Sequence, residues 1–134
     1  EFIYLENDDF PTEEEQFAWV ELIEQVSMNI MQSGRPVLWT MAGNLDKLHK
    51  VYCRRFFADV KCLALTCEED LLRKRMREGR GITNEGWIQS SVDYNEYFRT
   101  RDHHGDTYFE TFDISGKAVE EVADYVTKWV KVNC

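Results

Sequence analysis

Short apolar runs alternate with amphipathic helical segments along the whole chain, and this alternation constrains the fold more than any other feature. The apolar runs lie at residues 2–5, 37–42, 60–65 and 107–114. The first three are apolar at nearly every position, which is typical of strands that are covered on both faces. Parallel strands need crossover connections, usually helices, so the pattern predicts an α/β domain.

The segments between these runs carry helix signals. Thr12 and Glu15 have capping-box spacing before an apolar face that continues to Gly34, and Thr66 and Glu69 repeat the spacing. Apolar periodicity and stop signals predict further helices at residues 44–56, 67–78, 84–98 and 119–129.

These elements predict one domain over residues 1–134, built as a three-layer sandwich with a mainly parallel sheet. A helical lid is expected at about residues 68–106, before the last strand. Ligands of open parallel sheets lie beyond the carboxyl ends of the strands. Functional residues are therefore expected in the loops at that edge.

The charge of the chain excludes some classes of partner. The formal net charge is −9 and the pI is near 4.8, so a broad nucleic-acid or anionic-membrane surface is not expected. No apolar run approaches the ~20 residues of a bilayer span, and no signal peptide opens the chain. The four cysteines lack CxxC spacing, which predicts reduced thiols in a cytoplasmic protein.

Four segments together give the chain a resemblance to a known superfamily. They are an acidic loop at Leu5–Phe10, a strand and loop at Trp39–Asn44, an arginine-rich segment at Leu71–Gly81 and a final strand end at Phe112–Gly116. Their order resembles the small-molecule and nucleotide kinases of the P-loop NTPase superfamily, including proteins described as AAA-family ATPases. The resemblance implies ATP and Mg²⁺ as cofactors, and transfer of a phosphoryl group to a small acceptor.

The sequence departs from that superfamily at the phosphate-binding loop. No G-x-x-x-x-G-K-[ST] segment occurs, and none of the seven glycines begins one. This loop supplies backbone N–H groups and a lysine to the phosphates, so its absence predicts weak nucleotide binding by this chain alone. In the superfamily it would precede Glu1, so we expect a parent chain about 25–45 residues longer at the N-terminus.

The acidic loop offers the predicted catalytic base. The resemblance gives Asp8 the role of activating an acceptor hydroxyl, with Asp9 as a substrate ligand. The alternative is that both carboxylates only solvate the loop and cap the following helix.

A basic cluster offers the predicted phosphate site. In an acidic chain, five cations lie within eight residues: Arg73, Lys74, Arg75, Arg77 and Arg80. On a helix, Arg73, Arg77 and Arg80 share one face and could neutralise a transferring phosphoryl group, so we assign them catalytic roles. The alternative is a solvated helix whose arginines pair with nearby acidic residues.

The other predicted site residues come from several loops and the lid. Asn44, Trp87, Tyr94 and Asn95 are predicted to bind the acceptor through an aromatic wall and amide groups, although core packing is an alternative for Trp87. The resemblance places Ser115 and Gly116 near the nucleotide, together with Arg77 and Arg80. Ordinary turn chemistry is the alternative for Ser115 and Gly116.

No metal ligands are assigned, because His103 and His104 are adjacent and match no common metal site. Two functions therefore compete. The first is an ATP-dependent phosphotransferase of which this chain holds the acceptor and lid side. The second is a non-catalytic binding or interaction module. Because a missing central strand would expose apolar sheet edges, a rearranged sheet, strand exchange or a homodimer that covers those edges is also expected.

Overall fold

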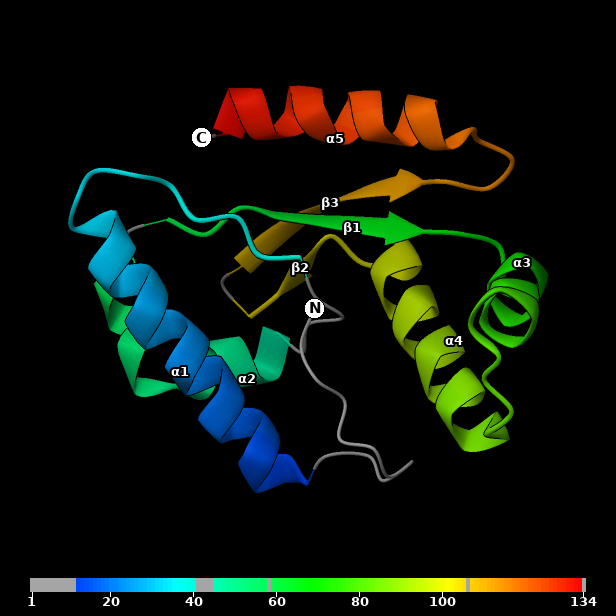
Figure 1. Cartoon of the computed structure of the whole chain (residues 1–134), viewed down its shortest axis with the longest axis horizontal. Helices are drawn as coiled ribbons and strands as arrows, with labels where there is room; N and C mark the ends of the chain where they lie inside the picture. The colour runs from blue at the N-terminus through cyan, green and yellow to red at the C-terminus, as the bar shows by residue number, and fades with distance from the viewer. Residues whose placement is uncertain (1–11, 41–44, 58, 106, 134) are drawn as a thin grey trace. The chain divides into compact units, whose positions relative to one another are not determined.

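The computed structural model describes residues 12–40, 45–57, 59–105 and 107–133 (Figure 1). Contacts within the chain divide it into two compact units, Glu1–Asp59 and Val60–Cys134, and each is described by itself. The prediction of one domain over the whole chain stays a prediction. The run at residues 2–5, and with it Asp8, Asp9 and Asn44, lies outside the described residues.

Helix α1 (Glu13–Met31) begins at the predicted capping box. The backbone N–H of Thr12 donates to Glu15 Oε2 at 2.7 Å, and the N–H of Glu15 donates to Thr12 Oγ1 at 3.3 Å. The N-terminus of this helix is therefore correctly predicted. Its fully buried positions, however, form a narrow strip in which two of the three side chains are polar: Val20, Glu24 and Ser27.

The apolar segment after α1 is not a strand in the residues that can be described. Residues 35–40 have no regular secondary structure. The indole Nε1 of Trp39 donates to Ser27 Oγ at 2.8 Å, and its ring packs edge-on against Phe57. Helix α2 (Leu45–Lys50) and the 3₁₀ helix η1 (Tyr52–Phe56) complete the first unit.

The second unit contains a small mixed sheet, with strands in the order β1-β3-β2. Strand β1 (Cys62–Thr66) pairs in parallel with β3 (Thr107–Asp113), and β2 (His103–His104) pairs antiparallel with β3. Thr66 and Asp113 are register partners at the carboxyl ends of the parallel pair. The helical elements of the unit are α3 (Glu69–Lys74), the π-helical segment η2 (Arg75–Gly79), α4 (Glu85–Thr100) and α5 (Val119–Asn133).

Helices α4 and α5 cover opposite faces of this sheet (Figure 1). Successive residues of a strand point to opposite faces. Phe109 packs against Phe98 of α4, with 4.9 Å between ring centroids, whereas Phe112 stacks on Tyr125 of α5 at 3.7 Å. The strands β1 and β3, which lead into the two loops, therefore have α4 on one side of the sheet and α5 on the other.

The predicted three-layer sandwich with a mainly parallel sheet is wrong. The described sheet has three strands and one parallel pair, and helices hold most of the described residues. The apolar runs at 60–65 and 107–114 correspond to β1 and β3, but residues 37–40 form no strand. Trp39 contacts α1 through its side chain instead, and Leu38 is 58% exposed, so this run is not covered on both faces as a buried strand would be.

The helices predicted at 67–78 and 84–98 are present with shifted ends. Glu69, not Cys67, begins α3, because Thr66 is the last residue of β1 and caps no helix. Asn84, the first residue of the second predicted helix, lies just before α4 and caps it, and its Oδ1 accepts from Trp87 N–H at 3.0 Å. Within the described ranges, no helix is both long and apolar enough to cross a bilayer.

Candidate functional site

The candidate site lies at the carboxyl ends of β1 and β3, where two short connections begin. The N–H of Ile114 donates to the Thr66 carbonyl at 2.8 Å, which continues the pairing one residue beyond β3. Beyond this bond the chain turns at Cys67–Glu68 and at Ser115–Gly116. Such an edge is where open α/β sheets bind ligands.

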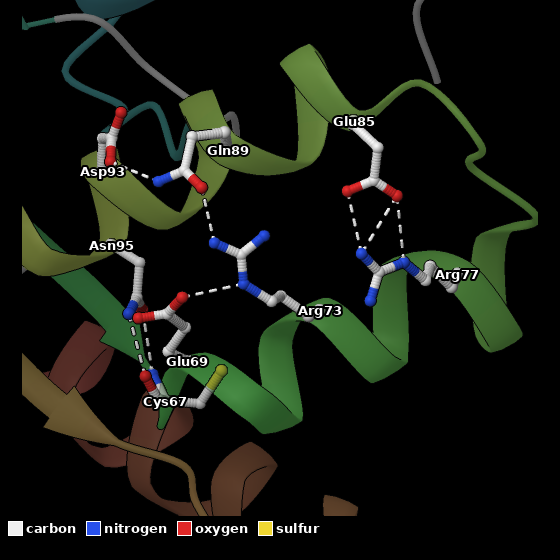
Figure 2. A network of polar contacts seen from close by, with 8 residues as sticks. All are labelled: Cys67, Glu69, Arg73, Arg77, Glu85, Gln89, Asp93 and Asn95. Atoms are coloured by element: carbon white, nitrogen blue, oxygen red, sulfur yellow. Dashed lines mark hydrogen bonds and ion pairs between the residues drawn. The ribbon is translucent and has the colours of Figure 1, made fainter.

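Asn95 fixes the first of these connections. Its Nδ2 donates to the carbonyl of Cys67 at 2.8 Å, and its Oδ1 accepts from the Cys67 N–H at 3.0 Å (Figure 2). One side-chain amide thus satisfies both backbone groups of a residue outside any helix or strand. Asn95 is predicted to bind the acceptor, but in the structure its side chain supports the loop after β1.

Ser115 joins the two connections. Its hydroxyl oxygen accepts from the Glu68 N–H at 2.8 Å, and its own N–H donates to Asp113 Oδ1 at 2.8 Å. The hydrogen bond from the Ser115 hydroxyl, then the one from its N–H, lowers the pKa of Asp113, with Arg99 and Lys117 adding to the shift. Gly116 has φ +67°, which an L side chain rarely adopts, so the turn requires glycine.

The predicted lid arginines pair with neighbouring side chains (Figure 2). Arg73 Nε lies 2.8 Å from Glu69 Oε1, and its Nη2 donates to Gln89 Oε1 at 2.5 Å. Arg77 makes a fork-like contact with Glu85, with its Nη2 2.8 Å from Oε2 and its Nε 3.3 Å from Oε1. These two guanidinium groups link α3 and η2 to the residues of α4.

The remaining predicted residues are not gathered at one point. Arg80 is exposed after η2, and Trp87 is half-buried in the first turn of α4. The Tyr94 ring stacks on that of Tyr97 and meets Phe98 edge-on, so it belongs to an aromatic cluster between α4 and the sheet. Among the predicted residues that can be described, the structure brings only Asn95 and Ser115 to the same segment, Cys67–Glu68.

Three cations lie near this edge: Arg75, which belongs to the predicted basic cluster, and Arg99 and Lys117, which lie outside it. Arg99 Nη1 donates to the Cys67 carbonyl at 3.2 Å. Arg99 and Lys117 both help to lower the pKa of Asp113, and the charges of Arg75 and Arg99 oppose the rise that burial causes in the pKa of Cys67. The signal for Arg99 was its place four residues after Asn95, on the same face of α4.

Arg75 and Lys117 also line an apolar hollow of about 550 Å³ beside this edge. Lys117 Nζ is 3.0 Å from Glu121 Oε1, and no ion pair joins Arg75 to another residue that the structure describes. The volume lies in the range of small-molecule sites, ~300–1,000 Å³. The lining residues are Arg75, Ile114, Lys117, Val119, Val122, Ala123, Val126 and Thr127.

The thiol at the site is unsuited to nucleophilic chemistry. Cys67 is 4% exposed, and burial raises the pKa of its thiol, which disfavours the reactive thiolate. Across the described ranges, no three His, Cys, Asp or Glu side chains are grouped as metal ligands. Asp102 pairs with His103 and Tyr97 with His104.

The second unit is thus a small α/β unit in which Arg75, Arg99 and Lys117 lie near a strand edge that also carries the carboxylates of Asp113 and Glu68. No protein-family model, curated protein or solved structure matches the chain.

Proposed function

We propose that the second unit binds the phosphate group of a small molecule at the carboxyl edge of β1 and β3. The observation that supports this proposal is the gathering of Arg75, Arg99 and Lys117, from three different elements, in a chain with a net charge of −9. Guanidinium and ammonium groups are suited to a phosphate.

The reaction class that we propose is phosphoryl transfer from ATP to a small acceptor, in the cytoplasm. It rests on the order of the sequence segments, not on a P-loop fold, and function can persist on different scaffolds. In this proposal the present chain holds the acceptor and lid side. Mg²⁺ would accompany the phosphates of ATP, and no step is assigned to it, since the described residues supply no metal-ligand group.

A calorimetric titration with inorganic phosphate, AMP and Mg-ATP tests the proposed site. The double variant Arg75→Gln/Lys117→Gln should bind phosphate-bearing ligands at least about tenfold more weakly, because each charge-assisted hydrogen bond contributes ~1.5–3 kcal/mol. Lys128→Gln/Lys131→Gln is the matched control, since it makes the same charge change on α5 outside the lining residues.

Two results would contradict the proposal. Equal weakening by both double variants would mean that only the overall charge matters. If Arg73→Gln/Arg77→Gln abolishes binding and Arg75→Gln/Lys117→Gln does not weaken it, the phosphate binds to Arg73 and Arg77 instead. The second outcome would also require the Glu69 and Glu85 pairs to open when ligand binds.

The second candidate function is a non-catalytic module that binds a second copy of the chain. It is favoured by an exposed apolar stripe on α1, in which Leu22 is 58%, Val26 52% and Ile30 41% exposed. A stripe of this kind on a helix often marks a protein contact. Sedimentation at increasing concentration should show dimers, and Leu22→Ser/Val26→Ser should abolish them. A monomer at all concentrations would exclude this candidate.

A further inference from the structure

The hollow beside the proposed phosphate site has an unusually uniform lining. Five of its residues are aliphatic: Ile114, Val119, Val122, Ala123 and Val126. Among the residues that the structure describes, no aromatic ring lines it, and Thr127 is the only neutral side chain there with a hydrogen-bonding group. A nucleobase carries several polar edge atoms that would lose their water in such a place without gaining partners. The lining therefore favours an aliphatic body.

The two charged residues of the lining are both positive. Arg75 comes from η2 and Lys117 from the turn before α5, so both precede the aliphatic part of α5 in the chain. Glu121, the carboxylate paired with Lys117, is itself 56% exposed. Charge complementarity therefore predicts an occupant with a negative head group and an apolar tail.

We infer that the ligand of the proposed site is a phosphate monoester of an aliphatic alcohol. This inference rests on the proposed function and specifies its ligand. The phosphate lies between Arg75 and Lys117, and the alkyl chain lies along Val119, Val122 and Val126 of α5. As a phosphotransferase, the protein would then act on an aliphatic alcohol and not on a nucleoside.

The test is a calorimetric series with inorganic phosphate, butyl phosphate, hexyl phosphate and octyl phosphate, below their micelle concentrations, and with AMP. Each buried methylene contributes ~0.8 kcal/mol, which corresponds to up to about fourfold in affinity. Affinity should therefore rise with chain length, and octyl phosphate should bind more tightly than AMP.

Ala123→Phe is designed to fill the hollow from an exposed position on α5. It should remove the dependence on chain length and leave the affinity for inorganic phosphate within about twofold. Val132→Phe is the control, because Val132 is 84% exposed on the same helix and is not part of the lining. It should bind the whole series as the unchanged protein does.

The outcomes separate this inference from the proposed function. If all alkyl phosphates bind no better than inorganic phosphate, or if AMP binds most tightly, the inference is wrong and the phosphate site stands. If no phosphate compound binds, both are wrong. Equal effects of Ala123→Phe and Val132→Phe would place the alkyl chain elsewhere and overturn the inference, as would octanol binding as tightly as octyl phosphate.

Discussion

The side-chain amide of Asn95 forms hydrogen bonds with both backbone polar groups of Cys67, at 2.8 Å and 3.0 Å. Arg99, one turn further along α4, donates to the same carbonyl at 3.2 Å. The connection after β1 is thus held by α4 rather than by its own turn. A movement of α4 would therefore displace the Glu68 N–H and also the Ser115 hydroxyl to which that N–H donates.

Asn95→Ala should destabilise the second unit measurably. It leaves the N–H of a buried residue, Cys67, without its partner, and an unsatisfied buried group costs ~1–3 kcal/mol. Hydrogen exchange of the β1 and β3 amides, read as an opening free energy, measures the effect. Ser90→Ala, at an exposed position of the same helix, should change it by less than ~0.5 kcal/mol. Equal effects would show that the two bonds to Cys67 contribute little.

Glu24 should make the first unit less stable as the pH rises. The side chain is fully buried on α1, and neither carboxylate oxygen has a hydrogen-bond partner. Burial, with the negative charge of Glu21, raises the pKa of Glu24 from 4.5 to about 7, and the positive charge of Arg54 opposes this. Between pH 4.5 and 7 the folded state therefore binds more protons than the unfolded state, so stability falls with rising pH and then levels off.

The measurement is the opening free energy of α1 by hydrogen exchange at pH 5 and at pH 7.5. Glu24→Gln keeps the shape but carries no charge, so it should match the unchanged protein at pH 5 and exceed it by on the order of 1–3 kcal/mol at pH 7.5. Glu14→Gln, at an exposed position of the same helix, should keep the original pH dependence. If the pH dependence remains in Glu24→Gln, a group other than Glu24 causes it.

Ser115→Ala should raise the pKa of Asp113. The hydroxyl is the largest cause of the lowered pKa of this carboxyl group, and the N–H of residue 115 remains as the second. A lowered pKa contributes stability above the unfolded value of ~3.9, and this contribution is lost as the pH falls through the folded value. Carboxyl titration by NMR measures the pKa, and acid unfolding should begin at a higher pH in the variant. Ser90→Ala, exposed on α4, is the control.

Tyr125→Ala should loosen α5 from the sheet without unfolding the rest of its unit. No residue of α5 is fully buried, and its described contacts with β3 are the Phe112–Tyr125 stack and the bond from Trp129 Nε1 to Glu110 Oε1 at 2.9 Å. An aromatic pair contributes ~0.5–1.5 kcal/mol beyond buried area. Hydrogen exchange should accelerate in α5 alone.

Val132→Ala, at an exposed position of α5, is the comparison for Tyr125→Ala. If both variants accelerate exchange in α5 equally, helix propensity and not docking determines its protection. If Tyr125→Ala accelerates exchange across β1 and β3 as well, α5 is part of the cooperative core of the unit.

The helices could be predicted from local signals, but the sheet could not. Thr12 and Glu15 cap α1 through contacts three residues apart, and such contacts are readable in one sequence. A strand needs a distant partner. Residues 37–40 and β1 have similar apolar character, yet only β1 pairs with another strand. Thr66 illustrates the same limit, because its pairing with β3 overrides its capping-box spacing to Glu69.

The candidate site could be predicted as a region but not as a set of side chains. The carboxyl edge follows from the order of elements. Asn95 and Ser115 are predicted as acceptor and nucleotide ligands, and the structure shows both bonded to the Cys67–Glu68 segment. Arg73, Arg77 and Arg80 are predicted site residues because they share one helical face. A shared face does not determine which residues of other elements that face contacts. Arg73 and Arg77 meet Glu69 and Glu85, pairs that depend on where α4 lies.

The π-helical segment η2 has a consequence for the length of the chain. A π turn closes over one residue more than an α turn, so deleting one residue from Arg75–Gly79 can leave a continuous helix. Because the wider turn takes up the extra residue locally, the residues that follow would keep nearly the same direction relative to those before. Arg80 would stay close to its present side relative to Arg73. The π turn therefore absorbs the extra residue, and a chain one residue shorter here would present its cations in nearly the same direction.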